Sequence, residues 1–600
     1  MSHKQIITKY KKLLTKHSEE LKKIKHTLKW IMVFRLFLFT LTVYFLILAV
    51  KNSNIIYGSI SFISFIIFLF AIKYALKLNF RKGIILELIK IDNNELSALQ
   101  HNFTPFDGGV SLQDDHHPFT YDLDLFGEGS LFQQINRTVS SIGKMMLGEW
   151  MKFPLTEPNL IQKRQMAIDE LKEHLDYLHK FRAYGGYANH DTLKNRQNIL
   201  YWVQENLSAK RYSFYKNIAI IFTFISICVL ILSFLNVVPS RLIFLLFIIN
   251  GTILFSKIKQ INREHSLIGK RYELIRQYAS KFKIIEEIDF KGDLLKEIRN
   301  KIIDSEYSAG KALKSLASII NVFDYRLNMI VSIILNGFFF WDFFSMIRLY
   351  RWKKKYGPYF VEWFQALDQF DALQSISNYH YNNPDFVFAT FETDINLLEV
   401  KDLGHPQIDP AKRILNDLSI KNRGEFMIIT GPNMAGKSTF LRTVGTSIIL
   451  AQCGAPVCAT YFNLTPLILY TSMRTSDSLH RNESYFYAEL KRLKEILNAI
   501  EIHENIFIIL DEILKGTNST DKANGSKEFL KKIISLKATG IIATHDLSLG
   551  DTENEMPDLV KNYCFESKNE NQMIIFDYLL KKGKTTRMNA MYLMKNMGII

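Results

Sequence analysis

Cysteine is scarce in this chain of 600 residues, and its few copies follow no recognisable framework. None are spaced as zinc ligands or as the bridges of a disulfide scaffold, and one lies inside an apolar run. This excludes a cysteine-rich secreted fold, which needs several disulfides to hold it together. We predict a reducing, cytosolic setting for the parts outside any membrane. The four cysteines are Cys228, Cys453, Cys458 and Cys564.

Acidic residues are also in short supply relative to basic ones. The chain has 75 Lys and Arg against 59 Asp and Glu, a formal net charge of +16 and a pI of about 9.3. Such a balance suits polyanions or an anionic membrane face. Part of the excess is local, because residues 1–29 carry nine lysines against two glutamates. Basic charge alone therefore does not separate nucleic acid from lipid as a partner.

Residues 1–29 have the periodicity of an amphipathic helix. Apolar positions recur three and four residues apart, as in a coiled-coil seam, with lysines on the other faces. The segment is predicted either to pair with another helix or to lie on the membrane or on the protein's own core. No small-residue cleavage site follows it, so we expect no removable signal peptide. The seam consists of Ile7, Tyr10, Leu14, His17, Leu21, Ile24 and Leu28.

Two pairs of apolar stretches follow, and both pairs share one design. In the first, residues 30–50 carry a single charge, Arg35, and residues 55–72 carry none. In the second, residues 217–240 and 242–256 are both uncharged. A stretch of about 20 apolar residues is long enough to cross a bilayer. Lysines and arginines flank the outer ends of both pairs.

These flanks predict two transmembrane hairpins, 30–72 and 217–256, with their outer ends in the cytoplasm. We expect an integral protein of a bacterial-type inner or plasma membrane, with the N-terminus and the C-terminal domain cytoplasmic. The alternative is that each pair is a buried hairpin of a soluble domain. A shorter apolar run, 327–341, is predicted to be a core helix.

The strongest motif is a phosphate-binding loop between a strand and a helix. Residues 426–429 are an apolar run typical of a buried strand, and apolar residues recur at helical spacing from Phe440. Between them lies Gly-x-x-x-x-Gly-Lys-Ser, whose backbone N–H groups surround an anion at a helix N-terminus. This predicts a site for ATP and Mg²⁺. Its residues are Gly431, Pro432, Asn433, Met434, Ala435, Gly436, Lys437, Ser438 and Thr439.

Two later strands end in residues suited to ATP hydrolysis. Residues 506–510 are apolar and lead into Asp511, which would hold Mg²⁺, and Glu512, placed to orient and deprotonate the attacking water. Another apolar strand ends at His545, which could sense the γ-phosphate. A structural role for this histidine is the alternative.

Membrane helices followed by an ATPase also suggest an ABC exporter half. Two features count against it. The chain has four convincing spans rather than six, and residues 481–490 read Arg-Asn-Glu-Ser-Tyr-Phe-Tyr-Ala-Glu-Leu where an ABC protein has Leu-Ser-Gly-Gly-Gln.

Several ordered segments instead resemble those of the MutS mismatch-repair ATPases. Residues 430–439 resemble the family's phosphate-binding loop, with Ala435 where the family usually has glycine. Residues 484–490 are similar to its Ser-Thr-Phe-Met-x-Glu-Met signature, and residues 511–521 to its Asp-Glu-Ile-Gly-Arg-Gly-Thr segment. Weaker similarity covers residues 121–171, at the start of the family's helical core. Further similar segments are Leu403-Gly-His-Pro406, Ala451-Gln-Cys-Gly-Ala-Pro-Val457 and Ala543-Thr-His545.

The resemblance implies roles for the matching residues. Residues 431–439 would hold the triphosphate of ATP. Ser438 and Asp511 would bind Mg²⁺, Glu512 would activate water, and His545 would act as the switch.

The resemblance also implies a homodimer with composite ATP sites. Ser484 would reach across the dimer to the γ-phosphate of the partner's ATP. Leu514 and Lys515 replace the usual Gly-Arg of the family, and this departure bears on the geometry of the turn after Glu512.

Other departures concern the reading of DNA. Family mismatch sensors carry an N-terminal domain with a Phe-x-Glu wedge, but only about 40 residues separate Arg81 from Tyr121, too few for an ordinary domain. Phe391-Glu392 does not supply the wedge, because it lies just before the ATPase. The second hairpin interrupts the helical core roughly where the family extends levers towards a DNA clamp. We infer that the mismatch-reading parts are absent and that a membrane anchor occupies their space.

The predicted fold class is an α/β P-loop ATPase domain of MutS or ABC type, preceded by an all-α core with two inserted transmembrane hairpins. The predicted divisions are a basic helix at 1–29, hairpin 30–72, a linker at 73–120, helical core 121–216, hairpin 217–256, helical core 257–394 and ATPase 395–600.

Three functions remain open from the sequence. The first is a dimeric, membrane-anchored ATPase that binds DNA and is related to mismatch repair. The second is a membrane ATPase of transport or remodelling type, ABC-like, that no longer binds mismatched DNA. The third is a scaffold whose ATPase only controls dimerisation.

Overall fold

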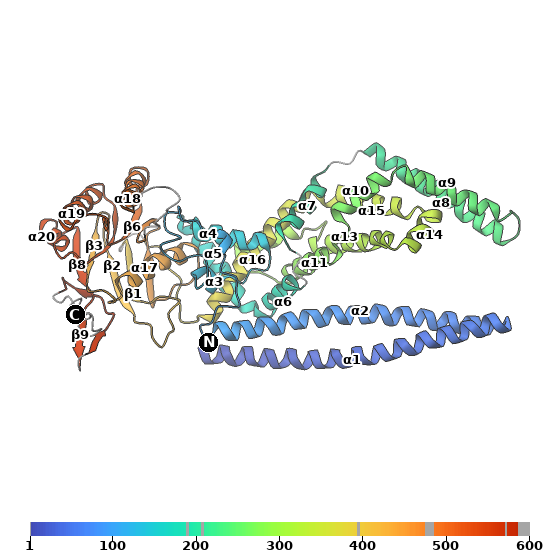
Figure 1. Cartoon of the computed structure of the whole chain (residues 1–600), viewed down its shortest axis with the longest axis horizontal. Helices are drawn as coiled ribbons and strands as arrows, with labels where there is room; N and C mark the ends of the chain where they lie inside the picture. The colour runs from blue at the N-terminus through green and yellow to red at the C-terminus, as the bar shows by residue number, and fades with distance from the viewer. Residues whose placement is uncertain are drawn as a thin grey trace.

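The computed structural model describes residues 2–187, 191–205, 209–392, 397–474, 485–570 and 573–585. The molecule is elongated, with an α/β domain at one end, a helical region in the middle and two helical hairpins that reach the other end, the first of which begins beside the helical region (Figure 1). The predicted order of a helical region followed by an α/β domain is confirmed.

Two long helices form the first hairpin, α1 (His3–Asn52) and α2 (Ile55–Ala98). The chain reverses at Ser53, whose φ of 49° is left-handed. Asn54 then caps α2, because its side-chain oxygen accepts a hydrogen bond from the N–H of Ile56 at 2.9 Å. The two helices lie side by side and antiparallel along their length (Figure 1).

The first hairpin differs from the predicted divisions. Residues 1–29 are not a separate helix, because α1 continues unbroken into the apolar stretch. Residues 73–98, predicted as part of a linker, continue α2, since their apolar side chains recur at helical spacing and are buried against the rest of the chain. The seam of residues 1–29 packs on α2 and on this chain's own core; its buried members are Tyr10, His17 and Ile24, together with Ile6.

The middle of the molecule is a helical core. Its longest member, α16 (Phe360–Asn382), is buried along almost its whole length. The helices before the second hairpin are α3 (Leu131–Ile135), α4 (Ser141–Lys152), α5 (Pro158–Leu171), α6 (Leu175–Gly186) and α7 (Leu193–Gln204). Those after it, besides α16, are α10 (Ile258–Ile268), α11 (Tyr272–Glu287), α12 (Asp293–Ile302), α13 (Ala309–Phe323), α14 (Met329–Phe339) and α15 (Trp341–Tyr356).

A buried carboxylate fastens α2 to this core. Glu95 is fully buried and accepts hydrogen bonds from Arg137 (2.8 Å) and Arg182 (2.6 Å). It also accepts from the amides of Asn378 (3.1 Å) and Asn382 (2.8 Å) on α16. Burial would raise the pKa of Glu95, but the two guanidinium groups outweigh it and hold the pKa below its usual range. Glu95 is therefore charged and joined to α6, to α16 and to the loop after α3.

The second hairpin consists of α8 (Ala209–Phe234) and α9 (Arg241–Phe255), and α14 packs against it. Residues 327–341 were predicted to form a core helix, which is wrong for one face of α14: Met329 is 76% exposed and Ile334 is 50% exposed. The inner face of α14 is apolar because it packs against α9. The outer face is exposed and is apolar as well.

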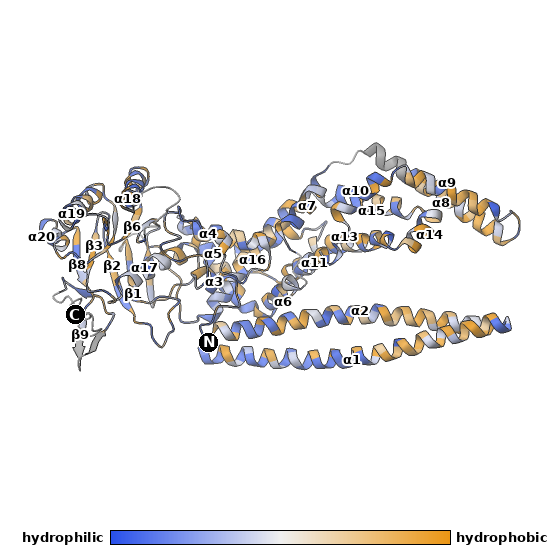
Figure 2. Cartoon of the chain, viewed as in Figure 1, coloured by the Kyte–Doolittle hydropathy of each residue, from blue (hydrophilic) through white to orange (hydrophobic). Residues whose placement is uncertain are grey.

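Among the described residues, three helices are long and apolar enough to cross a membrane, by length and composition alone. They are α1, α2 and the part of α8 from Lys216 to Phe234. The number rises to five if two bent pairs are each taken as one span, namely α9 with α10 and α13 with α14. The apolar segments of both hairpins lie towards the end of the molecule away from the α/β domain (Figure 2).

The α/β domain is built on a six-stranded sheet in the order β11-β8-β3-β7-β6-β5, in which the five strands from β8 to β5 run parallel and β11 pairs antiparallel with β8. A three-stranded antiparallel sheet, β2-β1-β4, and a hairpin, β9-β10, complete it. The strands are β1 (Leu398–Leu403), β2 (Asn416–Ile420), β3 (Phe426–Thr430), β4 (Tyr461–Leu464), β5 (Ile468–Ser472), β6 (Ile506–Asp511), β7 (Thr539–Thr544), β8 (Val560–Cys564), β9 (Ser567–Glu570), β10 (Met573–Phe576) and β11 (Lys581–Lys582). The helices are α17 (Lys437–Gln452), α18 (Tyr485–Ile502), α19 (Ser519–Ser535) and α20 (Thr552–Glu555).

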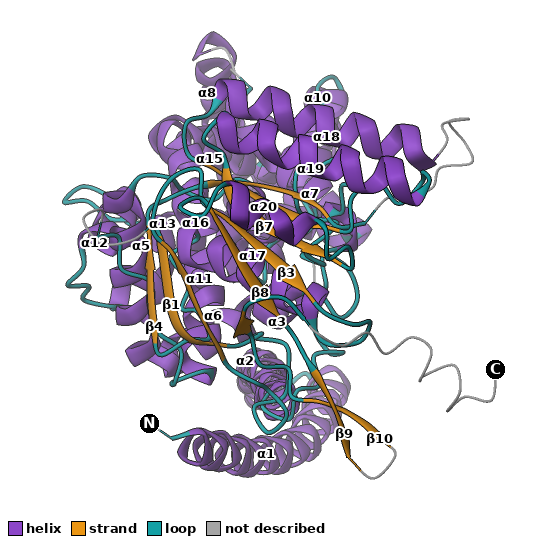
Figure 3. Cartoon of the chain, turned by 90° about the vertical axis from the view of Figure 1, so that its left-hand side faces the viewer, coloured by secondary structure: helices purple, strands orange, loops and turns teal. Residues whose placement is uncertain are grey.

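Both faces of the parallel sheet are covered, which explains its continuous apolar strands. Met427 and Ile429 of β3 belong to the cluster that includes α17 and the helical core. Phe426 and Ile428, which alternate with them, belong to the cluster under α18 and α19. Figure 3 shows α18 and α19 together on one side of the strands.

The segment before α3 ties the helical core to the α/β domain. The carboxylate of Asp122 accepts hydrogen bonds from the hydroxyl of Thr471 (2.6 Å) and from the N–H groups of Met473 (3.1 Å) and Arg474 (2.9 Å). The side chain of Leu123 lies against Gly445 in α17, where an added Cβ would be 2.7 Å from it. The helix that follows the phosphate-binding loop is thus in direct contact with the core.

Replacing Glu95 by Gln should lower the free energy of unfolding by about 3–5 kcal/mol, because two buried guanidinium groups lose their counter-charge. Chemical denaturation of the purified protein checks this. Glu87→Gln is the matched control, because Glu87 lies on the same helix but is partly exposed and forms only a long ion pair with Lys90, at 3.9 Å. This substitution should shift the denaturation midpoint little. Equal midpoints for Glu95→Gln and wild type would show that the network does not hold the hairpin.

Candidate functional site

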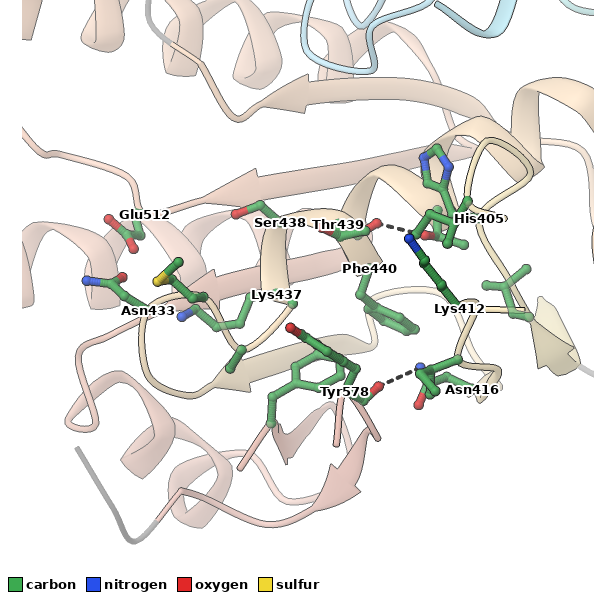
Figure 4. Close-up of a pocket in the computed structure, with 18 residues that line it drawn as sticks. His405, Lys412, Asn416, Asn433, Lys437, Ser438, Thr439, Phe440, Glu512 and Tyr578 are labelled. Atoms are coloured by element: carbon green, nitrogen blue, oxygen red, sulfur yellow. Dashed lines mark hydrogen bonds between the residues drawn. The ribbon is translucent and has the colours of Figure 1, made fainter. Parts of the chain in front are cut away.

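The phosphate-binding loop joins β3 to α17 and surrounds a cavity of about 440 Å³ (Figure 4). Two residues of the loop have left-handed backbones, Met434 with φ 66° and Gly436 with φ 98°. These conformations curl the chain so that α17 begins at Lys437 with its N-terminus towards the cavity. The loop residues that line it are Asn433, Met434, Ala435, Gly436, Lys437, Ser438 and Thr439.

Lys437 is 6% exposed and folds back onto its own loop. Its ammonium donates to the carbonyl oxygens of Gly431 (2.7 Å) and Pro432 (2.8 Å) and lies 3.5 Å from Nε2 of His545. Burial lowers the pKa of Lys437 to about 8. The ammonium group of Lys437 therefore lies inside the curve of the loop, between the end of β3 and the end of β7.

The carboxylates at the end of β6 face the loop. The hydroxyl of Ser438 donates to Asp511 at 2.5 Å, and burial raises the pKa of Asp511. Nε2 of His545 lies 2.6 Å from the carboxylate of Glu512, and Nζ of Lys515 lies 3.7 Å from it. The hydrogen bond from His545 lowers the pKa of Glu512 to about 2, so this carboxylate is charged at neutral pH.

The structure thus brings together most of the residues predicted from the sequence. Lys437, Ser438, Asp511, Glu512 and His545 meet although up to 108 positions separate them. Ser484, predicted to act across a dimer, lies outside the described residues. The roles assigned to these residues remain predictions.

The outer wall of the cavity was missed by the sequence reasoning. It includes His405, Lys412, Asn416, Phe440 and Tyr578, from the loop between β1 and β2, the start of β2, α17 and the segment after β10 (Figure 4). Asn416 donates to the carbonyl oxygen of Tyr578 at 3.1 Å, which fixes that segment beside the loop. Burial lowers the pKa of His405 to about 4, so its ring is neutral at neutral pH. The segment Leu403-Gly-His-Pro406 was the available signal for His405.

A second missed residue is Glu489 on α18. It is 3% exposed, and its carboxylate accepts a hydrogen bond from the N–H of Leu514 at 2.6 Å. The backbone N–H groups of Lys515 and Gly516 also face this carboxylate. Burial raises the pKa of Glu489, and the N–H groups of the loop that follows Glu512 favour its charged form.

This loop needs such support because two of its residues are left-handed. Glu512 has φ 51° and Leu514 has φ 60°, conformations that cost a residue with a side chain about 1–2 kcal/mol each. Leu514, where the family usually has Gly, is 7% exposed and packs in the core under α18 and α19. Gly516 lies against Phe486, where an added Cβ would be 2.8 Å away. Phe486 and Glu489 of the 484–490 segment thus hold the loop that aims Glu512.

Glu489→Ala should lower the turnover of ATP, the substrate that the sequence predicts, on the order of a hundredfold, because a small misplacement of Glu512 is enough for such a loss. The affinity for ATP should change little, since Glu489 does not line the cavity. Steady-state kinetics and nucleotide binding separate the two effects. Glu489→Gln keeps one acceptor and should lose less, while Glu495→Ala, an exposed position on the same helix, should lose nothing. A parallel loss of binding and turnover would contradict the positioning role.

The family model of MutS domain III matches residues 120–329, and that of MutS domain V matches residues 427–599. The chain is 34% identical to the MutS protein homolog 4 of Homo sapiens over 204 residues, which are 32% of this chain and 21% of that protein. It is 30% identical to the DNA mismatch repair protein MutS of Thermotoga maritima over 254 residues, or 41% and 31% of the two chains. The corresponding protein of Finegoldia magna is 34% identical over 206 residues, or 32% and 24%.

The matched part spans less than a third of the length of each of these relatives. MutS-family proteins are in general ATPases that use Mg²⁺, work as dimers and bind DNA. Two family models of different MutS domains match in the order in which the helical core and the α/β domain occur. The chain therefore belongs to the MutS family.

Proposed function

We propose that this protein is a membrane-anchored, dimeric MutS-family ATPase whose nucleotide state controls how it holds DNA. One observation carries the ATPase part. The ends of β3, β6 and β7 bring a phosphate-binding loop, a buried ammonium, a hydroxyl-carboxylate pair and a charged carboxylate beside one cavity. These are the groups that phosphoryl transfer to water requires.

The cavity fits ATP and Mg²⁺ in shape and chemistry. The aromatic side chains of Phe440 and Tyr578 line the outer wall, where a purine would lie, and the loop offers N–H groups to phosphates at the inner end. The Ser438 hydroxyl and the Asp511 carboxylate are adjacent oxygen ligands of the kind that Mg²⁺ prefers. The ion, when bound there, would neutralise charge on the phosphate oxygens.

The chain's own residues would then act on water and phosphate. Lys437 would exchange the carbonyl oxygens of Gly431 and Pro432 for phosphate oxygens. Glu512 would orient and deprotonate the attacking water, and His545 holds this carboxylate in place. Ser484 of the partner would complete the site, which makes hydrolysis depend on the homodimer.

Membrane anchoring is supported by the exposed surface of both hairpins. Large apolar side chains point outward along them, among them Phe37 (57% exposed), Phe62 (65%) and Phe244 (68%). Such contiguous apolar surfaces mark contacts with membrane or protein. Both tips point away from the α/β domain, as expected if one bilayer holds both hairpins and the ATPase stays on its cytoplasmic side (Figures 1 and 2).

DNA binding is supported by family membership and by the basic face of α1. Eight of the nine lysines in residues 1–29 are exposed, opposite the buried seam. Residues 99–130 form turns and one short 3-10 helix along the core, which supports the proposal that no mismatch-reading domain is inserted there. We propose DNA as a ligand without preference for a mispair.

A membrane-remodelling or transport-type ATPase is the second candidate. The observation that favours it is that the second hairpin is inserted within the region matched by MutS domain III. In that case lipid or a transported solute, rather than DNA, would change the rate of hydrolysis.

Hydrolysis of ATP by the protein in lipid nanodiscs tests the proposal. Wild type should turn over ATP faster with DNA, with a steep loss of stimulation as salt rises. Lys437→Ala should abolish ATP binding, and Glu512→Gln should bind ATP without hydrolysing it. Glu528→Gln on the exposed face of α19 is the matched control and should behave as wild type.

The outcomes of this assay separate the candidates. Stimulation by lipid or solute alone favours remodelling or transport, and turnover that no ligand changes favours a scaffold. Stable preference for a mispair over matched duplex contradicts the loss of mismatch reading. Normal hydrolysis by Glu512→Gln contradicts the catalytic assignment.

Affinity for ATP should fall as the pH rises above about 8. Burial lowers the pKa of Lys437 to about 8, whereas phosphates beside the ammonium would raise it. Below this pH the lysine is protonated with and without ATP, so affinity is level. Above it, binding takes up a proton and affinity should fall about tenfold per pH unit until the higher pKa is reached. Titration with a fluorescent ATP analogue at several pH values measures this affinity. Lys437→Arg should flatten the dependence of affinity on pH, because arginine stays protonated. A wild-type affinity that stays level up to about pH 10 would contradict the prediction.

A further inference from the structure

Helix α14 is an apolar element that the two proposed anchors do not account for. It has 11 residues, and its axis is bent by 106° from that of the preceding segment, α13 with its 3-10 extension. Its outward face is fully apolar: Met329 is 76% exposed, Ile330 72%, Ile333 46% and Ile334 50%. A soluble protein rarely leaves such a face open to water.

The inner face of α14 is built into the second hairpin. Gly337 lies so close to Phe247 of α9 that an added Cβ would be 2.1 Å from its ring. Asn250 of α9 is fully buried, and its amide donates to the carbonyl oxygen of Gly337 (2.7 Å) and to the hydroxyl of Ser226 on α8 (3.0 Å). One amide therefore links all three helices, α8, α9 and α14.

The chain returns after α14 to the side from which it came. Phe340 has a left-handed φ of 49° and is fully buried, and the indole of Trp341 donates to the carbonyl oxygen of Val322 at 2.8 Å. Arg326 before α14 and Asp342 after it form an ion pair at 3.2 Å. The backbone turn after α14 is thus covered by protein, and the ion pair between Arg326 and Asp342 joins the segments before and after the helix.

Length decides between a crossing and a re-entrant element. Eleven residues at 1.5 Å each give about 16 Å, roughly half the hydrocarbon thickness of a bilayer. Non-helical backbone at membrane depth is tolerated only where protein covers it, as at Phe340. The following helix, α15, carries Arg348 and the run Lys353, Lys354 and Lys355, and it leads on to α16 and the α/β domain.

We propose that α14 is a re-entrant membrane helix whose outward face contacts the lipid of the cytoplasmic leaflet. This proposal rests on the proposed membrane anchoring and adds α14 to the two proposed hairpins. The helices α8, α9 and α14 then form one membrane unit, which the hydrogen bonds of Asn250 hold together. Lipid is the occupant of this face because it continues the exposed apolar surface of α8 and α9, at the same end of the molecule as the apolar part of the first hairpin (Figure 2). Since α15 and α16 follow directly, the leaflet would be connected to the ATPase through a buried helix.

Single-cysteine labelling of the full chain in nanodiscs tests this proposal. In a Cys228→Ser background the other three cysteines are buried. An environment-sensitive dye would be placed at Ile334→Cys on α14, at Phe244→Cys on α9 and at Lys314→Cys on the exposed face of α13. Brominated lipid should quench the dye at 334 as strongly as at 244 and should leave the dye at 314 unchanged.

Each outcome of the quenching experiment decides one question. Quenching at 244 without quenching at 334 overturns the re-entrant helix while the anchor stands. Quenching at neither position overturns anchoring through the second hairpin, and the proposal for α14 falls with it. Positions 334 and 244 are exposed apolar sites and position 314 is an exposed lysine, so the substitutions leave the core intact.

Sidedness separates a re-entrant helix from part of a crossing span. Lys314→Cys before α14 and Lys354→Cys after it should both react with a membrane-impermeant maleimide in inside-out vesicles and both be protected in right-side-out vesicles. Reaction of the two positions from opposite sides would overturn the proposal.

Discussion

Parallel pairing of β3, β7 and β6 is the constraint on which the candidate site depends. In a parallel sheet the carboxyl ends of neighbouring strands lie on one edge, so the segments that leave them are neighbours whatever their distance in sequence. The in-register pairing of Thr430 with Thr544 and of Asp511 with Ala543 sets this edge. The loop, the carboxylates and His545 are therefore brought together by backbone geometry, and their side chains only complete the arrangement.

The same site is joined to the rest of the molecule through buried polar contacts. Asp122 binds backbone and side chain at the end of β5, next to α17. A short distance along the chain, Arg137 donates to the carboxylate of Glu95 on α2 and to the backbone carbonyl oxygen of Gln134. The side-chain amide of Gln134 in turn donates to the carbonyl oxygen of Pro406, beside the cavity. The first hairpin and the wall of the cavity beside the phosphate-binding loop thus share one buried network. Removing one partner of such a buried ion network leaves an uncompensated charge, so the network holds the first hairpin, the helical core and the α/β domain in one arrangement.

The helical hairpins impose a different physical demand on the chain. In a bilayer every backbone group must find its partner within the protein, and helices meet this demand by themselves. The proposed membrane parts are helical except at their turns, and the hydroxyls of Thr42 and Ser64, on the two helices of the first hairpin, lie 2.8 Å apart. In the α/β domain, by contrast, both faces of the parallel sheet are covered by side chains, and the polar groups of the candidate site lie at one edge of the sheet.

The sequence by itself determined the features that depend on local spacing. The phosphate-binding loop, the apolar strands that end in Asp511 and His545, the apolar hairpins and the MutS resemblance all lie in short continuous segments. Only the tertiary structure decided which distant residues support them. Glu489 and His405 lie in segments quoted for the resemblance, but the loop that one holds and the cavity that the other lines are non-local contacts. The sequence did not indicate the structural role of Glu95, because its hydrogen-bond partners lie 42 to 287 positions away along the chain. The exposed face of α14 could not be read either, since an apolar run has the same composition whether protein or lipid covers it.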